Sequence, residues 1–416
     1  MKVYLEVYGC TANKGDASLV LGLLKENDHE IVDNIDDADI LVLLTCTVIG
    51  TTEQRMLSRL RLFGKTGKKI IVAGCMASVQ SDLIKSVEPN AELLPPQYTH
   101  HVVDLVEGKS VPFINKNKTC SPKYFGETAA PISISEGCLF SCSYCITSLA
   151  RGKLISFPID QVVEDVSSAI NQGCKEIQLT AQDTGSYGLD TGNNLAELLE
   201  NVCQIEGEYR IRTGMMNPRT LLKNLDRIIQ AYGNSKIYKF LHIPIQSGDN
   251  DILQKMNRKY TIEDCIKIIN KFRKKYPEIV IATDIIVGFP TETDEQFEHT
   301  VDLLKSIKPD VTNITRYSAR PHTKAKTMKG RIKTEIVKER SRILTELCSN
   351  ISMKNNLNHI GKKYTVLITE KGKKNTMVGR AENYKPVAIK KQVYIGEFVP
   401  VKIEEAGSTY LVGRLI

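Results

Sequence analysis

Three short apolar runs in the first third of the chain each end in a cysteine. They cover residues 2–10, 39–46 and 68–75, and helix-like segments separate them. Short, nearly continuous apolar runs of this kind are typical of parallel strands buried on both faces. Because the carboxyl ends of such strands meet at one edge of the sheet, we expect the cysteines to converge there. We call Cys10, Cys46 and Cys75 the N-terminal triad. Each precedes a predicted helix start, which would favour its thiolate form.

A second series of strand-like runs follows a polar, irregular segment at 111–130 that is typical of a linker. Helix-like patterns fill the gaps between these runs, as at Val162, Val166 and Ile170. Six strand–helix units in succession predict a parallel barrel, complete or partial, with its site at the strands' carboxyl ends. The predicted strands are 131–137, 176–182, 210–215, 239–246, 281–289 and 311–317.

The pattern changes again near the end of the chain. An amphipathic helix is predicted from Ile336, Arg340, Ile343, Leu347 and Ile351, and period-two alternation at 364–369 and 399–403 then predicts short strands. Such strands with glycine-containing turns are typical of a small antiparallel barrel. The sequence therefore predicts an α/β fold with an N-terminal parallel α/β domain (1–110), a linker (111–130), a partial (β/α)6 barrel (131–354) and a C-terminal β-barrel (355–416).

Composition favours a cytoplasmic protein. No apolar stretch approaches the ~20 residues that span a bilayer, and the first residues do not form a signal peptide. In a reducing compartment, eleven cysteines favour metal or redox chemistry over disulfides. The net charge of +8 is modest for 416 residues, but residues 355–416 carry 11 Lys and Arg against 5 Glu, or 11 − 5 = +6. This excess predicts contact with a polyanion.

The most informative motif is CxxxCxxC at Cys138, Cys142 and Cys145, which we call the loop triad. A tetrahedral zinc or a complete iron–sulfur cluster takes four protein ligands, whereas this segment offers three. Three thiolates around a cubane would leave one iron open to a molecule from solution. Half of a zinc ribbon is the alternative for this triad, and three buried cysteines at strand ends are the alternative for the N-terminal triad.

The CxxxCxxC spacing resembles that of the radical S-adenosylmethionine (radical SAM) enzymes, and Tyr144 precedes the third cysteine as in those enzymes. With the N-terminal triad, the barrel and the basic β-module, the whole chain resembles the methylthiotransferase family. The resemblance implies two [4Fe-4S] clusters, an auxiliary one on Cys10, Cys46 and Cys75 and a radical SAM cluster on Cys138, Cys142 and Cys145. It also implies that the C-terminal module is a TRAM domain that engages substrate.

Local sequences indicate which substrate this resemblance implies. Four segments are similar to those of archaeal and eukaryotic enzymes that methylthiolate C2 of N6-threonylcarbamoyladenosine in tRNA: GCLFSCSYCITSLARG at 137–152, LTAQDTGSYG at 179–188, LHIPIQSG at 241–248 and ATDIIVGFPTET at 282–293. Eukaryotic relatives extend into a C-terminal membrane anchor, so the end at Ile416 favours an archaeal-type enzyme without membrane contact.

The resemblance further implies S-adenosylmethionine, tRNA and an electron donor protein as partners, while the oligomeric state is not predicted. Reduction of the loop-triad cluster would cleave S-adenosylmethionine to a 5′-deoxyadenosyl radical, and the auxiliary cluster would carry the sulfur. Residues at the predicted strand ends are expected to contact S-adenosylmethionine, although each also fits a turn or cap. They are Gln182, Asp183, Thr184, Gln246, Ser247, Asp284 and Gly288, together with Tyr144.

Rival functions remain at this stage. The same apparatus methylthiolates isopentenyladenosine in tRNA or an aspartate of a ribosomal protein, and a noncatalytic metal-dependent RNA-binding protein could use the cysteines structurally. Basic residues of the C-terminal module favour RNA over protein. They are Lys362, Lys363, Lys373, Lys374, Arg380, Lys390 and Lys391. Deleting the chain from about residue 356 is expected to weaken tRNA binding and to spare S-adenosylmethionine cleavage.

Overall fold

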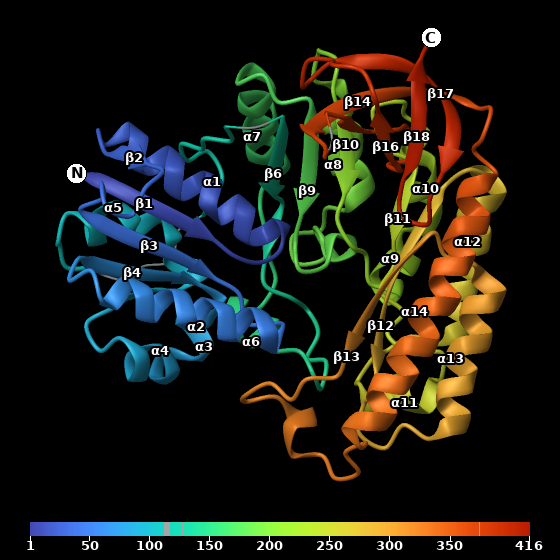
Figure 1. The fold of residues 1–416 in the computed structure, drawn as a ribbon, viewed down its shortest axis with the longest axis horizontal. Coiled ribbons are helices and arrows are strands. Elements are labelled where there is room, and N and C mark those ends of the chain that lie inside the picture. Colours follow the sequence, from blue (N-terminus) through green and yellow to red (C-terminus); the bar gives the residue numbers. More distant parts are fainter. Residues whose placement is uncertain (112–116, 127, 374) are drawn as a thin grey trace.

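The computed structural model describes residues 1–111, 117–126, 128–373 and 375–416. Figure 1 shows an N-terminal domain in blue and cyan beside a central barrel in green to orange, with a small red barrel over one end of the central one. Residues 112–116 and 127 of the predicted linker, and Lys374 of the predicted basic set, lie outside the described residues.

The N-terminal domain is built on a five-stranded sheet in the order β2-β1-β3-β4-β5, with every pair parallel. The central strand β3 is buried at all six positions, because helices cover both faces. Helices α1 and α5 pack on one face, and α2, α3 and α4 on the other. The strands are β1 (Lys2–Val7), β2 (Glu30–Val32), β3 (Ile40–Thr45), β4 (Lys69–Gly74) and β5 (Glu92–Leu94), and the helices are α1 (Thr11–Glu26), α2 (Gly50–Gly64), α3 (Cys75–Val79), α4 (Ser81–Val87), η1 (Pro96–His101) and α5 (Val102–Val106).

The central barrel has the six parallel strands that the sequence predicts, in chain order. They form two three-stranded sheets, β10-β9-β6 and β11-β12-β13, which the backbone hydrogen bonds of Ile211 to Lys236 and Tyr238 join at 2.7 and 3.0 Å. The barrel is therefore partial and open between β6 and β13. The strands are β6 (Ala129–Ser133), β9 (Glu176–Thr180), β10 (Arg210–Thr213), β11 (Phe240–His242), β12 (Val280–Val287) and β13 (Val311–Arg316).

Helices surround the barrel and pack on the outward side chains of its strands, such as Ile177, Ile211 and Ile281. Because side chains alternate along a strand, the inward positions of the same strands line the lumen. The helices are α7 (Ile159–Asn171), α8 (Leu195–Gln204), α9 (Pro218–Lys223), α10 (Leu225–Ala231), α11 (Asn250–Lys255), α12 (Ile262–Lys275), α13 (Asp294–Ile307) and α14 (Thr334–Leu357); the short elements are β7 (Ser135–Glu136), α6 (Thr147–Arg151), β8 (Ile155–Ser156), η2 (Thr184–Ser186) and η3 (Lys324–Thr327).

Helix α14 is the predicted amphipathic helix, and Arg340, Leu347 and Ile351 lie on its packed side, whereas the two other predicted residues do not. Ile336 and Ile343 are exposed, whereas Leu344 and Cys348 are buried against the barrel. Arg340 lies on the buried face because Glu292 and Asp294 accept its hydrogen bonds at 2.7 and 2.6 Å. The ion pairs of Arg340 therefore keep this side of α14 turned towards the barrel.

The C-terminal barrel closes in the order β14-β15-β16-β18-β17. Its pairs are antiparallel except for β16 with β18, which are parallel, so the all-antiparallel prediction is wrong for that pair. β17 lies between β16 and β18 in sequence but pairs with β18 on the side away from β16, so the chain returns to β16 in the parallel direction. The strands are β14 (Lys363–Lys371), β15 (Met377–Arg380), β16 (Pro386–Ile389), β17 (Phe398–Ala406) and β18 (Leu411–Leu415).

The C-terminal barrel is docked on the amino ends of the central strands. Lys385 is buried and donates to Asp310, just before β13, at 2.8 Å. The Tyr384 hydroxyl donates to Glu176, the first residue of β9, at 2.8 Å. Deleting residues from 356 onward would uncover this surface and leave the buried carboxylate of Asp310 without Lys385. The deletion would therefore disturb the central barrel as well as RNA contact.

No helix in the part of the chain that the structure describes is both long enough and apolar enough to cross a membrane.

Candidate active site

The N-terminal triad lies at the ends of three neighbouring strands, as the sequence predicts. Cys10 precedes α1, Cys46 follows β3, and Cys75 is the first residue of α3 after β4. A Cβ atom added to Gly9 would lie 3.0 Å from the Cβ of Cys46, so these two segments touch. Gly74 has φ +88°, and an added Cβ would lie 2.5 Å from the carbonyl oxygen of Thr45. Glycine therefore lets the ends of β3 and β4 approach closely.

Asn13 ties these strand ends together from the first turn of α1. Its fully buried side-chain amide donates to the carbonyl oxygens of Tyr8 and Thr45 at 2.7 and 2.8 Å, after β1 and at the end of β3. Its Oδ1 atom lies 3.9 Å from the Cys75 thiol and accepts a hydrogen bond from Arg151 at 2.8 Å. One side chain thus contacts all three strand ends and a residue of α6.

Four buried charges join the N-terminal domain to the segment that carries the loop triad. Arg151 donates to Asp16 and Glu136, both at 2.7 Å, and Lys118 donates to the same two carboxylates at 2.6 Å. All four side chains are at least nine-tenths buried, and their formal charges cancel. We call them the charge cluster. Because Arg151 lies six residues after Cys145, the cluster connects the two triads.

A second contact between the domains lies beside Cys46. Arg320, after β13, donates to Glu53 of α2 and to Gln80, the latter at 3.4 Å. Gln80 in turn accepts a hydrogen bond from Thr47 at 2.5 Å. The turn that follows Cys46 is therefore also held by an arginine of the central barrel region.

The prediction that helix starts favour thiolates in the N-terminal triad is wrong for two members. Burial raises the pKa of Cys46, and it raises the pKa of Cys75 to about 11 although the Arg151 guanidinium opposes the change. Desolvation therefore outweighs the helix ends and the nearby cation. Binding of a metal cluster here must release the thiol protons.

The loop triad is held within a short hairpin, residues 135–156, which β7 and β8 close. The Cys138 amide donates to the carbonyl oxygen of Gly152 at 3.1 Å. Gly137 has φ +76°, and an added Cβ would lie 2.0 Å from the carbonyl oxygen of Lys153, so only glycine fits this turn. On the other side, Ser143 donates through its amide to Met256 and through its hydroxyl to Lys255, at 3.0 and 2.9 Å.

Arg258 lies beside the loop triad. It is buried, donates to Cys142 Sγ at 3.4 Å and donates to the carbonyl oxygen of Pro244 at 3.2 Å. Burial raises the pKa of Cys138 to about 12, and it raises that of Cys142 while the Arg258 guanidinium lowers it. The same cation acts on the carboxylates of Asp183 and Asp284. Arg258 therefore contacts one thiol of the loop triad, and its positive charge opposes the rise in pKa that burial causes at both predicted carboxylates.

Several residues predicted to contact S-adenosylmethionine have partners within the protein. Asp183 accepts from the amides of Gly185 and Asn217 and from the Thr220 hydroxyl at 3.1, 2.9 and 2.9 Å, and burial raises its pKa to about 6. The Thr184 hydroxyl donates to Met215 at 3.0 Å, and the Ser247 hydroxyl accepts from Asp249 at 3.3 Å. The Gly288 amide donates to Glu292 at 3.0 Å. Tyr144 packs among Ile252, Met256 and Phe289.

Gln182 and Gln246 are the predicted contact residues whose side chains remain available. The Oε1 atom of Gln182 is buried without a hydrogen-bond partner. Gln246 has φ +77°, a conformation that is unusual for a side chain of this kind and that is often found at functional sites. Its backbone pairs with β12, and no hydrogen bond joins its side-chain amide to another of the described residues. Both amides can therefore bind a ligand.

Asp284 faces the lumen of the central barrel with partners on the two adjacent strands. His242 lies 2.9 Å from one carboxylate oxygen, and Asn313 donates to the other at 2.8 Å. Burial would raise the pKa of Asp284, but the hydrogen bonds from His242 and Asn313 lower it below its usual value. The lumen therefore carries an anionic carboxylate within a hydrogen-bonded row across β11, β12 and β13.

Each triad offers three thiols as possible ligands. Of the other cysteines, Cys174, Cys203, Cys265 and Cys348 are buried in the main hydrophobic core, and Cys120 lies 3.1 Å from Glu164. Among the residues that the structure describes, no three His, Cys, Asp or Glu side chains meet closely enough to hold a single metal ion. A cubane differs because each thiolate binds its own iron.

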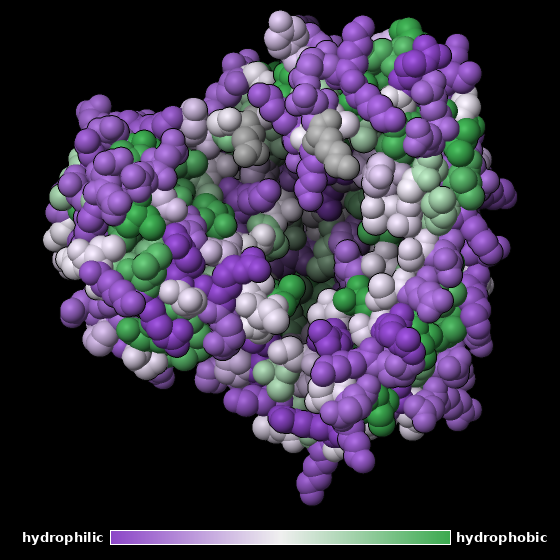
Figure 2. Space-filling view, in the orientation of Figure 1, coloured by the Kyte–Doolittle hydropathy of each residue, from purple (hydrophilic) through white to green (hydrophobic). Residues whose placement is uncertain are grey.

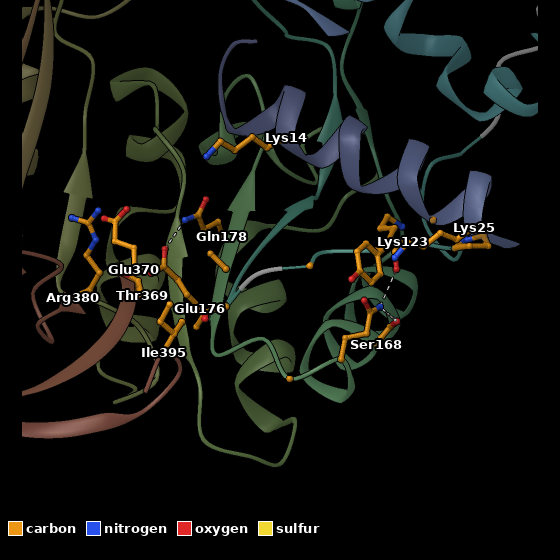
Figure 3. A pocket seen from close by; sticks show the side chains of 18 of the residues that line it. Lys14, Lys25, Lys123, Ser168, Glu176, Gln178, Thr369, Glu370, Arg380 and Ile395 are labelled. Atoms are coloured by element: carbon orange, nitrogen blue, oxygen red, sulfur yellow. Dashed lines mark hydrogen bonds between the residues drawn. The ribbon is translucent and has the colours of Figure 1, made fainter. Parts of the chain in front are cut away.

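A basic cavity of about 1200 Å³ lies where the three domains meet. Figure 2 shows the hollow at the centre of this face, and Figure 3 shows Lys14 reaching in from α1 while Arg380 reaches in from β15. Lys371 of β14 also lines it. Among the described members of the predicted basic set, only Arg380 lines the cavity, whereas Lys362 is paired with Glu278 at 2.7 Å.

Sequence reasoning missed the charged residues that connect these sites. Arg151 stands inside the quoted motif at 137–152, yet nothing in the motif indicates burial against α1. Asp16, Lys118 and Arg258 are single charged residues in ordinary polar surroundings of the sequence. A buried ion pair between distant residues leaves no periodic signal, so only the fold reveals it.

Comparison with known proteins gives three family matches. Residues 2–94 match a family described as Uncharacterized protein family UPF0004, residues 132–304 match the Radical SAM superfamily, and residues 358–416 match the TRAM domain. Among solved structures, the radical S-adenosylmethionine methyltransferase TsrM from Kitasatospora setae is similar at TM-score 0.58 and 12% identity, over 78% of this chain and 77% of that chain. At that identity the likeness concerns the fold.

Curated relatives match over the whole chain. A protein of Pyrococcus horikoshii is 44% identical over 427 residues, and one of Archaeoglobus fulgidus is 42% identical over 430; both cover 100% of this chain and at least 99% of the relative. Both are named "Probable threonylcarbamoyladenosine tRNA methylthiotransferase". The Homo sapiens "Threonylcarbamoyladenosine tRNA methylthiotransferase" is 32% identical over 433 residues, which is 99% of this chain and 74% of the human protein.

Proposed function

Because this chain belongs to the family of threonylcarbamoyladenosine tRNA methylthiotransferases, we propose that it methylthiolates C2 of N6-threonylcarbamoyladenosine at position 37 of tRNA. It is a radical SAM enzyme with a TRAM domain. The observation that carries the proposal is the presence of two cysteine triads, one gathered at three strand ends and one in a single hairpin, in a chain that matches its relatives from end to end.

Each triad is assigned one [4Fe-4S] cluster. Cys138, Cys142 and Cys145 hold the radical SAM cluster, and Cys10, Cys46 and Cys75 hold the auxiliary one. A bound radical SAM cluster supplies the electron that cleaves S-adenosylmethionine reductively. The protein supplies positive charge beside the thiolates: Arg258 balances thiolate charge at Cys142, and Arg151 does so near Cys75. Gln182 and Gln246 supply free amides for polar groups of S-adenosylmethionine.

The tRNA backbone is assigned to the basic cavity at the meeting of the three domains. Lys14, Lys371 and Arg380 line it, and none of them forms an ion pair with another described residue. Free cations from two domains suit a phosphate chain, because neutralised phosphates release counterions. The reductive step needs an external electron donor protein. Eleven cysteines without disulfides suit the cytoplasm, which keeps thiols reduced.

The experiment that tests the proposed function is mass spectrometry of tRNA nucleosides from a strain that lacks the gene. Loss of the methylthio derivative of threonylcarbamoyladenosine, restored by the wild-type gene and not by a Cys142→Ala variant, is expected. Loss of a methylthio isopentenyladenosine would instead identify that nucleoside as the substrate.

Two further outcomes would reject the proposal. An unchanged nucleoside profile together with loss of methylthiolation on a ribosomal protein aspartate would identify a protein substrate. Purified anaerobic protein that binds tRNA but forms no 5′-deoxyadenosine from S-adenosylmethionine under reducing conditions would identify a noncatalytic RNA-binding protein.

A further inference from the structure

Arg212 lies on β10 and points into the lumen of the central barrel. Its neighbours Ile211 and Thr213 are buried on the opposite face, where Ile211 packs against the surrounding helices. Arg212 is in register with Gln178 of β9, whose neighbours Ile177 and Leu179 face the same helices. Because side chains alternate along strands, Arg212 and Gln178 are adjacent inside the lumen.

The Arg212 guanidinium has no anionic partner. Its Nε atom is buried without a hydrogen-bond acceptor, and no hydrogen bond or ion pair joins the side chain to any other residue that the structure describes. The Oε1 atom of Glu176 accepts from Tyr384 at 2.8 Å and from Gln178 at 2.5 Å, and no ion pair joins the Glu176 carboxylate to Arg212. A half-buried cation without a counterion is costly, so its retention calls for an explanation.

Aromatic rings hold the guanidinium in place. It lies over Phe240 of β11 at 5.4 Å and over Tyr384 of the C-terminal barrel at 5.5 Å. Arg380 lies over the same tyrosine ring at 5.0 Å and lines the basic cavity. Stacking uses the faces of a guanidinium and leaves the N–H groups at its edge free to bind a carboxylate with two hydrogen bonds.

We propose that Arg212 binds the free carboxylate of the threonylcarbamoyl group and so selects tRNA that already carries this modification. The inference rests on the proposed function. In N6-threonylcarbamoyladenosine the threonine is attached through its nitrogen, which leaves its carboxylate free, whereas adenosine and isopentenyladenosine have no anion at this position. A fixed, unpaired arginine is the group that distinguishes these nucleosides.

The position of Arg212 along its strand suits this contact. The strand ends at Thr213, and Gly214 then donates to the carbonyl oxygen of Leu179, next to the segment that leads to Gln182. Arg212 is the residue before the last one of β10, so it lies about 3.4 Å below the level of the strand end. If adenine C2 lies at the level of the strand ends, the N6 substituent points down the lumen towards Arg212.

The inference also gives the C-terminal barrel a role in the central site. Tyr384 closes the floor of the lumen through its contacts with Glu176, Phe240 and Arg212. The TRAM domain therefore shapes the pocket for the modified base in addition to facing the tRNA backbone.

The test measures dissociation constants of the cluster-loaded enzyme for three anticodon stem–loops. They share one sequence and carry adenosine, N6-threonylcarbamoyladenosine or its threonine methyl ester at position 37. The wild type is expected to bind the acid about 10- to 100-fold more tightly than either other RNA, as expected when a charged hydrogen-bonding group loses its partner. Arg212→Gln should abolish that preference, and Arg212→Lys should keep part of it.

Arg210→Gln is the matched control, because this substitution also removes one positive charge from the same strand. Arg210 lies over Phe398 at 4.7 Å. The substitution should weaken all three RNAs to the same extent. Iron content and thermal unfolding report folding of each variant. If Arg212→Gln weakens the three RNAs equally, Arg212 only joins the two barrels and the inference fails.

The measurement on the wild-type enzyme alone also tests the role of Arg212. Equal affinity for acid and methyl ester would overturn the inference even if every Arg212 variant misfolded. Methylthiolation of the acid RNA by the wild type, scored separately by mass spectrometry, tests the proposed function. An enzyme that methylthiolates the acid RNA but shows no carboxylate preference refutes only the role of Arg212.

Discussion

The two cysteine triads contain the same three thiols but are assembled in different ways. The N-terminal triad gathers Cys10, Cys46 and Cys75 from three strand ends, and Asn13 and Arg151 hold those ends together. The loop triad lies within eight consecutive residues of one hairpin, pinned by Ser143 and approached by Arg258. The first site therefore depends on the packing of two domains, and the second depends mainly on a local turn.

This difference indicates how each site should fail. A site made by tertiary packing is lost when a distant contact is broken, whereas a loop keeps its ligand spacing as long as its hairpin closes. Both arginines are buried cations that approach a cysteine, but Arg151 also bonds two carboxylates and Arg258 bonds a backbone carbonyl. The predictions below separate these roles.

The largest effect is expected from removing each triad in turn. Cys138, Cys142 and Cys145 changed together to Ala should leave about half of the iron and abolish formation of 5′-deoxyadenosine. The same change at Cys10, Cys46 and Cys75 should also leave about half of the iron but should retain S-adenosylmethionine cleavage and lose methylthiolation. Iron analysis and product quantification under anaerobic conditions check both. Full iron content in either variant would contradict the ligand assignment.

Breaking the charge cluster should affect the N-terminal site selectively. Arg151→Ala leaves the buried carboxylates of Asp16 and Glu136 with Lys118 alone, and removal of one buried partner typically costs about 3–5 kcal/mol. We expect that loss in the free energy of unfolding and loss of the auxiliary iron. Arg342→Ala is the matched control, since its pair with Glu339 is exposed and contributes little. Denaturant unfolding and iron content measure both, and equal behaviour of the two variants would refute a role for the cluster.

Low pH should weaken the charge cluster. Burial alone would raise the pKa of Glu136, but Arg151 and Lys118 lower it from 4.5 to about 2. A carboxyl with a lowered folded-state pKa stabilises the protein above pH 4.5, and this contribution is lost as the pH falls towards 2. The difference corresponds to about 3 kcal/mol. Unfolding measured between pH 7 and 3 should therefore show a smaller decline for Glu136→Gln than for the wild type; parallel pH profiles would speak against this assignment.

Arg258 should have the smallest of these effects, confined to the loop triad. Removing one hydrogen bond to a charged sulfur costs about 1.5 kcal/mol, and Arg258→Gln is expected to lower the reduction potential of that cluster by roughly 60 mV. Redox titration followed by electron paramagnetic resonance measures it. Arg151→Lys, which keeps the charge at the other triad, should leave this potential unchanged. A shift of the same size in both variants would show that the two sites are not electrically separate.

Sequence reasoning succeeded where a pattern repeats. Strands that end in Cys10, Cys46 and Cys75, and six strand–helix units in a row, each produce a signal that recurs along the chain, so the fold and the convergence of the triad could be predicted. The parallel pairing of β16 with β18 and the exposure of Ile336 and Ile343 on α14 could not be predicted, because both depend on how segments distant in sequence pack together.

Single residues were harder to interpret than patterns. Asp183 and Thr184 stand at a strand end, where a ligand contact is expected, and both also form hydrogen bonds within the protein that the sequence did not indicate. Arg212 gave no signal, since an arginine in a strand is ordinary until its lack of a partner is visible in three dimensions. The contact between Arg151 and Asp16 spans 135 positions of sequence, and no local rule links them.

The charge cluster has a consequence for the order in which this protein matures on the ribosome. The three cysteines of the N-terminal triad are all synthesised by residue 75, but the arginine that neutralises Asp16 beside them is not synthesised until residue 151. A nascent chain that has completed only its first domain therefore has the auxiliary thiols without their cation. We expect stable loading of the proposed auxiliary cluster to follow the synthesis of Arg151, which completes the charge cluster that Lys118 and Asp16 begin.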